Sequence, residues 1–457
     1  MAKRYEKYKD SGIAWIGEIP EHWSVKRLND IGKYRKGPFG SALKVDSFID
    51  KSDDAIKVYE QQNAIKKSAI IGASYISKEY FENNMKGFEV CANDIIVSCA
   101  GTIGELFVLP SNIEKGIINQ ALMRMRMDCR YVNLSFFLYI FDILLRVESE
   151  QSSNGSAMKN IPPFDILKKI RIPLANISEQ EQIAKYLDWK CGEVDRIVEV
   201  RERQIKLLDE LRTSVISRAV TRGLNPNAPL KDSGIDWIGQ IPEHWEICRL
   251  KNACSLKGRI GWKGLRSEEF EQISYAYLVT GQDFHSAIID WTKCYQISKE
   301  RYDEDPYIQL SNGDLLITKD GTIGKIAKVS NMDKPSCLNS GIFVMKQTKA
   351  LFEQSYLYWL LESSLLKEFN NYTSTGTTIL HLYQNVFENM PFIIPSLSEQ
   401  QQIAEYLDKK TEEIDSTIDK FKVQIDKLKE YRQALITEVV TGKIDVRGIE
   451  IPTPKSN

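Results

Sequence analysis

Apolar residues recur at every seventh position between residues 398 and 440, with a companion set three or four residues further on. This a/d spacing is typical of a coiled-coil helix. A similar stripe runs between residues 178 and 222, and Arg201, Arg212 and Arg432 interrupt the two stripes. The predicted helix–helix seam consists of Leu187, Val194, Ile205 and Leu208 in the first stripe and Leu407, Ile414, Ile418, Phe421, Ile425 and Leu428 in the second.

Each stripe predicts a helix of about 40 residues, roughly 60 Å long. Ser178 and Ser398 are the expected N-caps, because Glu181 and Gln401 follow three residues later and complete a capping box. Two such stripes in one chain most simply face each other, and we expect the helices to be antiparallel. The alternative is that each stripe packs only on its own globular part.

Short apolar runs of β type precede each predicted helix. Residues 95–98 and 315–318 are two of these runs, and each leads into a Gly-Thr-Ile-Gly sequence, at 101–104 and 321–324. The glycines favour a tight turn. Each half of the chain therefore reads as a mixed, mostly β globular part followed by one long helix, and the fold class is α+β.

The chain contains one design twice. Residues 9–23 read KDSGIAWIGEIPEHW and return 222 positions later as KDSGIDWIGQIPEHW. A period this long far exceeds the roughly 20–50 residues of a solenoid repeat. The predicted boundaries are a first globular domain at 1–172, a central helix at 173–224, a second globular domain at 225–393, a C-terminal helix at 394–446 and a flexible tail at 447–457. His22 and His244 occupy equivalent positions beside a Trp, which favours structural hydrogen bonds over catalysis.

Composition narrows the class of protein. The chain has 457 residues, 42% of them hydrophobic, and a net charge of −1, as in ordinary globular proteins. We expect a cytoplasmic protein without a membrane span or signal peptide. Eight cysteines lie without a CxxC pair, which favours buried thiols over disulfides or zinc.

The usual catalytic signatures are missing. Residues 321–325 resemble a phosphate-binding loop, but their spacing is too short and Ile326 replaces the Ser or Thr that the motif requires. No metal-ligand spacing, dinucleotide fingerprint or nucleophile elbow is present. An enzyme that acts alone is therefore not expected.

Basic residues on glycine-rich loops follow the repeated motif in both halves and suit contacts to phosphates. Amide-rich segments further on suit base edges. The alternative for such charges is an ordinary solvated face. The predicted phosphate contacts are Lys33, Arg35, Lys36 and Lys44 in the first half and Lys257, Arg259, Lys263 and Arg266 in the second. The predicted base contacts are Gln61, Gln62, Asn63 and Thr102, and Gln282, Asp283, Lys319 and Thr322.

These motifs, in this order and twice over, resemble the specificity subunit of type I restriction-modification systems. They are the two openings, the two Gly-Thr-Ile-Gly loops and the helix starts SEQEQIAKYLD (178–188) and SEQQQIAEYLD (398–408). The resemblance implies two target-recognition domains that read a bipartite, asymmetric DNA site, separated by the helices. It implies a subunit without catalytic residues that directs adenine methylation or ATP-dependent cleavage by two methyltransferase and two motor-nuclease subunits. S-adenosylmethionine, ATP and magnesium would be bound by those partners.

Three other interpretations remain open at this point. The chain serves a methylation-only complex, it is a coiled-coil scaffold without DNA specificity, or it is a self-contained enzyme that binds a nucleotide on its glycine-rich loops. Neighbouring genes, a sequence-selective footprint and nucleotide-dependent turnover would separate them.

Overall fold

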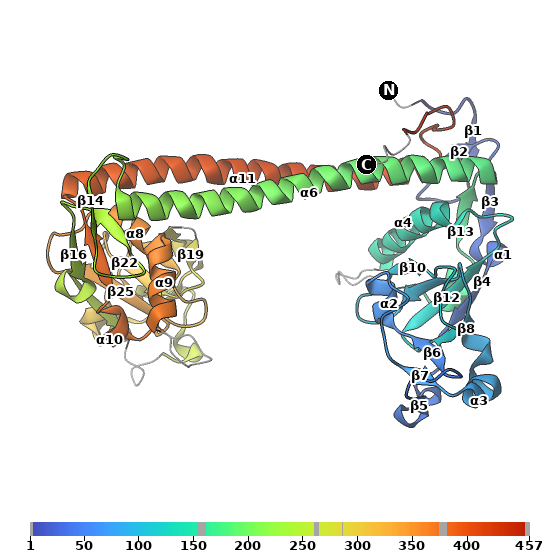
Figure 1. Ribbon diagram of the computed structural model, residues 1–457, viewed down its shortest axis with the longest axis horizontal. Coiled ribbons are helices and arrows are strands. Elements are labelled where there is room, and N and C mark those ends of the chain that lie inside the picture. The colour runs from blue at the N-terminus through green and yellow to red at the C-terminus, as the bar shows by residue number, and fades with distance from the viewer. Residues whose placement is uncertain (1–2, 153–160, 260–264, 286, 374–381, 453–457) are drawn as a thin grey trace. The chain divides into compact units, whose positions relative to one another are not determined.

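The computed structural model describes residues 3–152, 161–259, 265–285, 287–373 and 382–452 (Figure 1). It divides into two compact units, one formed by residues 1–200 with 424–457 and the other by residues 201–423. Each unit holds one of the predicted globular domains together with part of both long helices. The long helices are α6 (Ile177–Arg222) and α11 (Leu397–Val440).

The described residues of unit 1 form two sheets and two strand pairs. The first sheet has the order β10 (Leu106–Val108), β9 (Ile95–Ser98), β12 (Leu122–Met127), β4 (Gly32–Lys36). The second has the order β5 (Phe48–Ile49), β7 (Tyr75–Ile76), β6 (Ile56–Tyr59), β11 (Gly116–Ile118), β8 (Glu89–Val90). The pairs are β1 (Tyr8–Asp10) with β2 (Glu18–Pro20) and β3 (Ser24–Arg27) with β13 (Arg171–Leu174). The helices besides α6 and α11 are α1 (Leu28–Ile31), α2 (Gln61–Ile65), α3 (Lys78–Tyr80), α4 (Leu134–Ser152) and α5 (Phe164–Leu167).

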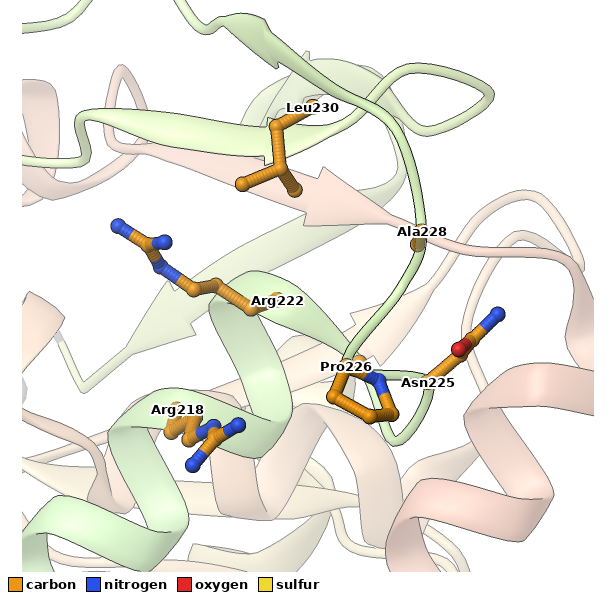
Figure 2. Close-up of a pocket in the computed structure, with 7 residues that line it drawn as sticks. Arg218, Arg222, Asn225, Pro226, Ala228 and Leu230 are labelled. Atoms are coloured by element: carbon orange, nitrogen blue, oxygen red, sulfur yellow. The ribbon is translucent and has the colours of Figure 1, made fainter.

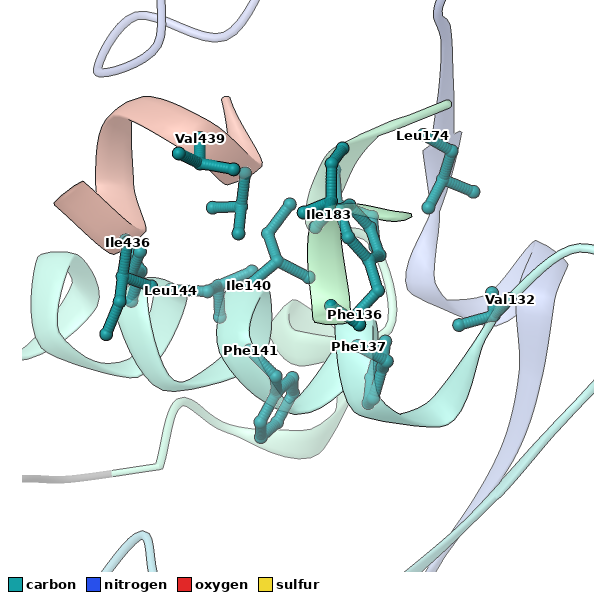
Figure 3. Close-up of a cluster of buried hydrophobic side chains, with 14 of the residues drawn as sticks. Val132, Phe136, Phe137, Ile140, Phe141, Leu144, Leu174, Ile183, Ile436 and Val439 are labelled. Atoms are coloured by element: carbon teal, nitrogen blue, oxygen red, sulfur yellow. The ribbon is translucent and has the colours of Figure 1, made fainter. Parts of the chain in front are cut away.

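Strand β12 shows how alternation directs its side chains. Its sequence LMRMRM places Met123, Met125 and Met127 on the face that enters the main core, while Arg124 and Arg126 point to the other face. Helix α4 covers the methionine face. Figure 3 shows Ile140 and Leu144 of α4 directed toward Ile183 of α6 and toward Ile436 and Val439 of α11, while the Phe137 and Phe141 rings lie on the other side of α4.

Unit 2 repeats this plan. Its larger sheet has the order β17 (Cys254–Gly258), β25 (Ile342–Gln347), β22 (Leu315–Thr318), β23 (Ile326–Lys328), β20 (Ile288–Ile289), β19 (Phe284–His285). Its smaller sheet has the order β21 (Tyr295–Ile297), β18 (Ala276–Val279), β24 (Ser336–Leu338). The pairs are β14 (Leu230–Asp232) with β15 (Gln240–Pro242) and β16 (Glu246–Arg249) with β26 (Pro391–Ile394). The shorter helices are α7 (Lys299–Asp303), α8 (Gln354–Glu362), α9 (Ser364–Thr373) and α10 (Gln384–Phe387).

The long helices face each other in antiparallel directions within each unit. In unit 1, Nε of Arg432 lies 3.3 Å from Oδ1 of Asp195, so the end of α11 packs beside the beginning of α6. In unit 2, Nε of Arg212 lies 3.1 Å from Oδ1 of Asp415, and the Arg201 guanidinium stacks 4.6 Å from the centre of the Phe421 ring. The arginines that interrupt the apolar pattern therefore make polar and stacking contacts between the helices.

The predicted seam residues are all buried or half-buried. Each stripe also packs on its own globular part, which was the alternative arrangement. Leu187 belongs to the core of the first domain and Leu407 to that of the second. Each helix end is thus held by its partner helix and by a globular domain.

The predicted N-caps are wrong by two residues. Helices α6 and α11 begin at Ile177 and Leu397. The caps are Asn176, which accepts from the Glu179 backbone at 3.0 Å, and Ser396, which accepts from the Glu399 backbone at 3.3 Å. The Ser396 backbone donates back to the Glu399 carboxylate, so the capping box forms there instead.

The segment after α11 also differs from the prediction of a flexible tail from residue 447. The side chain of Gln182 on α6 donates to the carbonyl oxygens of Val446 at 3.1 Å and Ile449 at 2.8 Å. The Asp445 backbone donates to the Lys3 carbonyl at 2.8 Å. Residues 447–452 are therefore placed against unit 1, and residues 453–457 lie outside the described ranges.

Candidate nucleic-acid interface

Three loops and the start of helix α2 meet at one edge of the globular domain in unit 1, and we call this set the unit-1 loop edge. Strands β6 and β11 are parallel, so their carboxyl ends open at the same edge. Strands β4 and β9 also end there, since both pair with the beginning of β12. The loops are Gly37–Phe39, Cys99–Gly104 and Asn119–Ala121, and the start of α2 is Glu60–Asn63.

Backbone contacts join these loops. The Gly37 amide donates to the Leu122 carbonyl at 2.8 Å. A side chain at Gly37 would place its Cβ 1.8 Å from the Asn119 oxygen, so only glycine fits. The Asn119 amide in turn donates to the Tyr59 carbonyl at 3.0 Å.

The Gly-Thr-Ile-Gly turn completes the unit-1 loop edge. The Cys99 amide donates to the Ala121 carbonyl at 2.8 Å, and the Gln61 side chain donates to the Ala100 carbonyl. Gly101 and Gly104 have φ values of 57° and 85°, where side chains are strained. The prediction of a tight turn is confirmed. Burial raises the pKa of the Cys99 thiol to about 11 against the opposing charge of Lys36, so the thiol stays protonated near neutral pH.

Unit 2 builds the same edge from equivalent residues. The Asn339 amide donates to the Val279 carbonyl at 2.9 Å, and the Lys319 amide donates to the Gly341 carbonyl at 2.9 Å. A Cβ at Gly281 would lie 2.9 Å from Cγ2 of Thr318, so this loop and the turn are in contact here as well. The unit-2 loop edge comprises Thr280–Asp283, Thr318–Gly324 and Asn339–Gly341.

The exposed side chains differ between the two loop edges. In unit 1 they come from Lys36, Phe39, Gln62, Thr102 and Gln120, and in unit 2 from Gln282, Asp320, Thr322 and Ser340. Lys319 is half-buried, with its amino group 4.9 Å from the centre of the Phe343 ring. The frame is therefore shared, while the groups offered to a ligand are not.

Two predicted base contacts are wrong. Asn63 is 1% exposed and Asp283 is 4% exposed. Each fixes its own loop by accepting a backbone hydrogen bond from three residues earlier, at 2.7 Å from Glu60 and at 2.6 Å from Thr280. Burial raises the pKa of the Asp283 carboxyl above its usual range. These side chains hold the loops that carry Gln62 and Gln282.

The predicted phosphate contacts have different outcomes in the structure. Lys36 lies at the unit-1 loop edge and is exposed. Arg259 is wrong as a surface contact, because it is 2% exposed and its Nε donates to the Leu338 carbonyl at 3.0 Å. Lys263 lies outside the described residues.

The other predicted basic residues are exposed but lie outside the segments that form the two loop edges. Lys33 and Arg35 project from β4, opposite Arg126 and Arg124 of β12, and the Arg35 guanidinium stacks 4.6 Å from the centre of the Phe88 ring. The remaining three are Lys44, which follows the first loop, Lys257 on β17, and Arg266. The Lys257 amino group lies 5.8 Å from the centre of the Tyr307 ring.

Sequence reasoning missed Phe39, Gln120 and Ser340. Gln120 and Ser340 each follow an asparagine that recurs 220 residues apart, Asn119 and Asn339. That recurrence was the available signal for them. Nothing in the sequence marks Phe39 as exposed.

The repeated histidines are structural, as predicted. Nε2 of His22 lies 2.8 Å from the Glu179 carboxylate, which also accepts from the Tyr5 hydroxyl at 2.7 Å. In unit 2, His244 makes the equivalent contact with Glu399 at 2.8 Å. Burial alone would raise the pKa of the Glu399 carboxyl, but hydrogen bonds from His244, Trp245 and Ser396 outweigh it and hold that pKa below its usual range.

A shallow cavity of about 340 Å³ lies at the end of α6 (Figure 2). Arg218 and Arg222, both exposed, line it together with Asn225 and Pro226. No carboxylate, thiol or imidazole is among its lining residues, so its chemistry is that of two guanidinium groups on the last turns of α6.

All eight cysteines are free, and Cys191, Cys254, Cys294 and Cys337 are buried, whereas Cys91 and Cys129 are exposed. No helix within the described ranges combines the length and apolarity that crossing a membrane requires. In the same part of the chain, no group of three or more His, Cys, Asp or Glu residues is placed to hold a metal ion.

Two domains that present one loop frame with different exposed side chains define a duplicated binding protein. The family model for the type I restriction modification DNA specificity domain matches this chain twice, at residues 20–205 and 242–427. The chain therefore belongs to that family.

Relatives agree with this assignment. The chain is 25% identical over 440 residues to the type I restriction enzyme MjaVIII specificity subunit of Methanocaldococcus jannaschii, covering 94% of this chain and 95% of that protein. It is 25% identical over 209 residues to the type I restriction enzyme EcoKI specificity subunit of Escherichia coli, covering 45% and 44%.

Solved structures share the fold. One chain from the work "Structural basis underlying complex assembly and conformational transition of the type I R-M system" matches with a TM-score of 0.70 at 15% identity, covering 93% of this chain and 99% of that chain. The HsdS subunit from Thermoanaerobacter tengcongensis matches with a TM-score of 0.51 at 16% identity, covering 93% and 98%.

Proposed function

We propose that this chain binds a bipartite, asymmetric DNA site, with one half-site on each loop edge, and directs partner subunits to that site. The observation that carries the proposal is the recurrence of one loop frame with different exposed side chains. A shared frame suits two similar segments of duplex DNA, and different side chains suit two different base sequences. Gln62, Gln120 and Gln282 offer amides that are able to bond base edges in the major groove.

The reactions belong to partners in this proposal. Two methyltransferase subunits would modify adenine and two motor-nuclease subunits would cleave, and these partners would bind S-adenosylmethionine, ATP and magnesium. The chain itself would be non-catalytic. The structural role of both repeated histidines supports this view. We also propose that the complex is cytoplasmic.

The test is a map of methylated bases in DNA from cells that carry this chain and its methyltransferase subunit. A double variant, Gln62→Ala with Gln120→Ala, should relax only one half of the methylated motif. The matched double variant in unit 2, Gln282→Ala with Ser340→Ala, should relax only the other half. Methylation that is unselective with the wild-type chain would contradict the proposal and favour a scaffold. Cleavage assays with the motor-nuclease added separate a restriction complex from a methylation-only complex.

A further inference from the structure

Phe39 stands at the unit-1 loop edge with 89% of its surface exposed. Among the described residues, no large apolar side chain is more exposed. Single exposed apolar residues are common on proteins and need no function by themselves. The position of Phe39 and the rigidity of its loop distinguish it from these.

The loop is fixed on both sides of Phe39. On one side, Gly37 donates to the Leu122 carbonyl at 2.8 Å, and the adjoining Pro38 is buried. On the other side, the Phe39 carbonyl accepts from the Ala42 amide at 2.9 Å. An aromatic ring is therefore held out into solvent by a backbone that has little freedom to fold it back.

The neighbours of Phe39 are polar. Gly37 lies against the backbone of Asn119 and Gln120, so the ring shares its edge with the exposed Gln120 side chain and with Lys36. An exposed ring on a loop that follows an exposed lysine and packs against the backbone of an exposed glutamine matches the chemistry of nucleic-acid recognition, where aromatic rings stack on bases. Apolar side chains also insert between base steps and unstack them.

We propose that Phe39 inserts its ring into the base stack of the half-site bound by unit 1. This inference rests on the proposed function. Lys36, which directly precedes this loop, would contact a flanking phosphate, and Gln120 would contact an adjacent base edge. Phe39 thus contributes stacking and local unstacking of the duplex rather than hydrogen-bond readout.

The experiment uses the full chain with its methyltransferase subunit and a duplex that carries the methylated sequence mapped for the wild type. The adenine analogue 2-aminopurine replaces one adenine at a time along the unit-1 half-site, because its fluorescence rises when it is unstacked. The methylated adenine itself is left unchanged, since methyltransferases flip their target base. The wild-type complex should raise the fluorescence at one step. Phe39→Ala should abolish that rise and weaken binding about tenfold, with an unchanged salt slope because no phosphate contact is lost.

Further variants separate stacking from simple apolar contact. Phe39→Trp and Phe39→Tyr should keep both affinity and fluorescence, whereas Phe39→Leu should lose the fluorescence rise. Ile273→Ala is the matched control, because Ile273 is 87% exposed but precedes β18, at the end of that strand opposite the unit-2 loop edge. It should change neither measurement.

Two outcomes would overturn the inference while leaving the proposed function intact. One is selective binding by Phe39→Ala with wild-type affinity and fluorescence. The other is wild-type affinity in Phe39→Leu together with no fluorescence rise at any step in the wild-type complex, which would assign an apolar contact, such as one with a thymine methyl group, instead of insertion. Unselective binding by the wild-type complex would contradict the proposed function itself.

Discussion

The indole nitrogen of Trp23 donates a hydrogen bond to the carboxylate of Glu179 at 3.0 Å. The two residues are 156 positions apart and both are buried. Trp23 ends the repeated opening motif and Glu179 lies in the first turn of α6, so this contact fixes the motif to the helix. Trp245 and Glu399 repeat the contact in unit 2 at 3.3 Å.

Removing the Glu179 carboxylate should destabilise unit 1 strongly. Glu179→Ala leaves the buried Trp23 and Tyr5 donors without an acceptor, at a cost of about 3 kcal/mol. Glu399→Ala should cost less, about 1 kcal/mol, because the Glu399 side chain is 34% exposed, against 3% for Glu179, and water can replace it. Hydrogen exchange measured separately over residues 5–25 and 225–247 resolves the two units. Equal losses of protection would show that burial does not control how much each carboxylate contributes to stability.

Asp283→Asn should change how stability depends on pH. Burial raises the pKa of Asp283 in the folded chain, so the carboxyl ionises more easily in the unfolded chain. The free energy of unfolding is therefore lowered at pH values above the folded pKa. This loss is absent below the unfolded pKa of about 3.9. The wild type should therefore lose stability as pH rises from about 4 through the folded pKa. The asparagine keeps an acceptor for the Thr280 amide and has no such titration, so the variant should be more stable at pH 7.

Thermal unfolding from pH 3.5 to 7.5 measures this dependence. The reciprocal variant Asn63→Asp is the control, because it places a carboxyl at the equivalent buried position. It should also lose the bonds from Asn63 Nδ2 to the Ser68 and Ile71 carbonyls, at 2.9 and 2.8 Å, and so be destabilised at neutral pH. A wild type and an Asp283→Asn variant with parallel pH profiles would show that Asp283 does not titrate in this range.

Periodic and repeated features of the fold were predictable from sequence, because they depend on local spacing. The long helices, their antiparallel pairing and the Gly-Thr-Ile-Gly turns follow from heptads and glycines. The helix starts were misplaced because Asn176 and Ser178 are both good N-caps, and the backbone path, not the residue type, selects between them. Asn63 and Asp283 were misassigned because an amide or carboxylate suits a buried loop as well as a base edge, and only tertiary packing decides which.

Arg259 was misassigned for the same reason, because a guanidinium suits a buried carbonyl as well as a phosphate. Lys36 and Arg259 can therefore be compared directly. Lys36→Ala should weaken DNA binding by all sequences alike and lower the slope of log K against log salt by about 0.9, since its exposed ammonium suits a phosphate contact. Arg259→Met should leave that slope unchanged, because the Arg259 guanidinium bonds the Leu338 carbonyl inside unit 2. It should instead lower the melting temperature. Titrations of the methyltransferase complex at several salt concentrations measure both slopes. A flatter slope for Arg259→Met would contradict its assignment as an internal residue.

The long helices should set the spacer of the DNA site if each loop edge reads one half-site. Deleting residues 201–207 and 421–427 together removes one heptad from α6 and one from α11, in the region where Arg201 stacks on Phe421. The seam keeps its register, and each helix shortens by roughly 10 Å, which is about three base pairs of B-form DNA. Mapping of methylated sites should then show both half-sites unchanged and a shorter spacer. Deleting residues 201–207 alone is the control, because it shifts one helix against the other and should abolish methylation. An unchanged spacer in an active double-deletion complex would show that the helices do not measure the distance between half-sites.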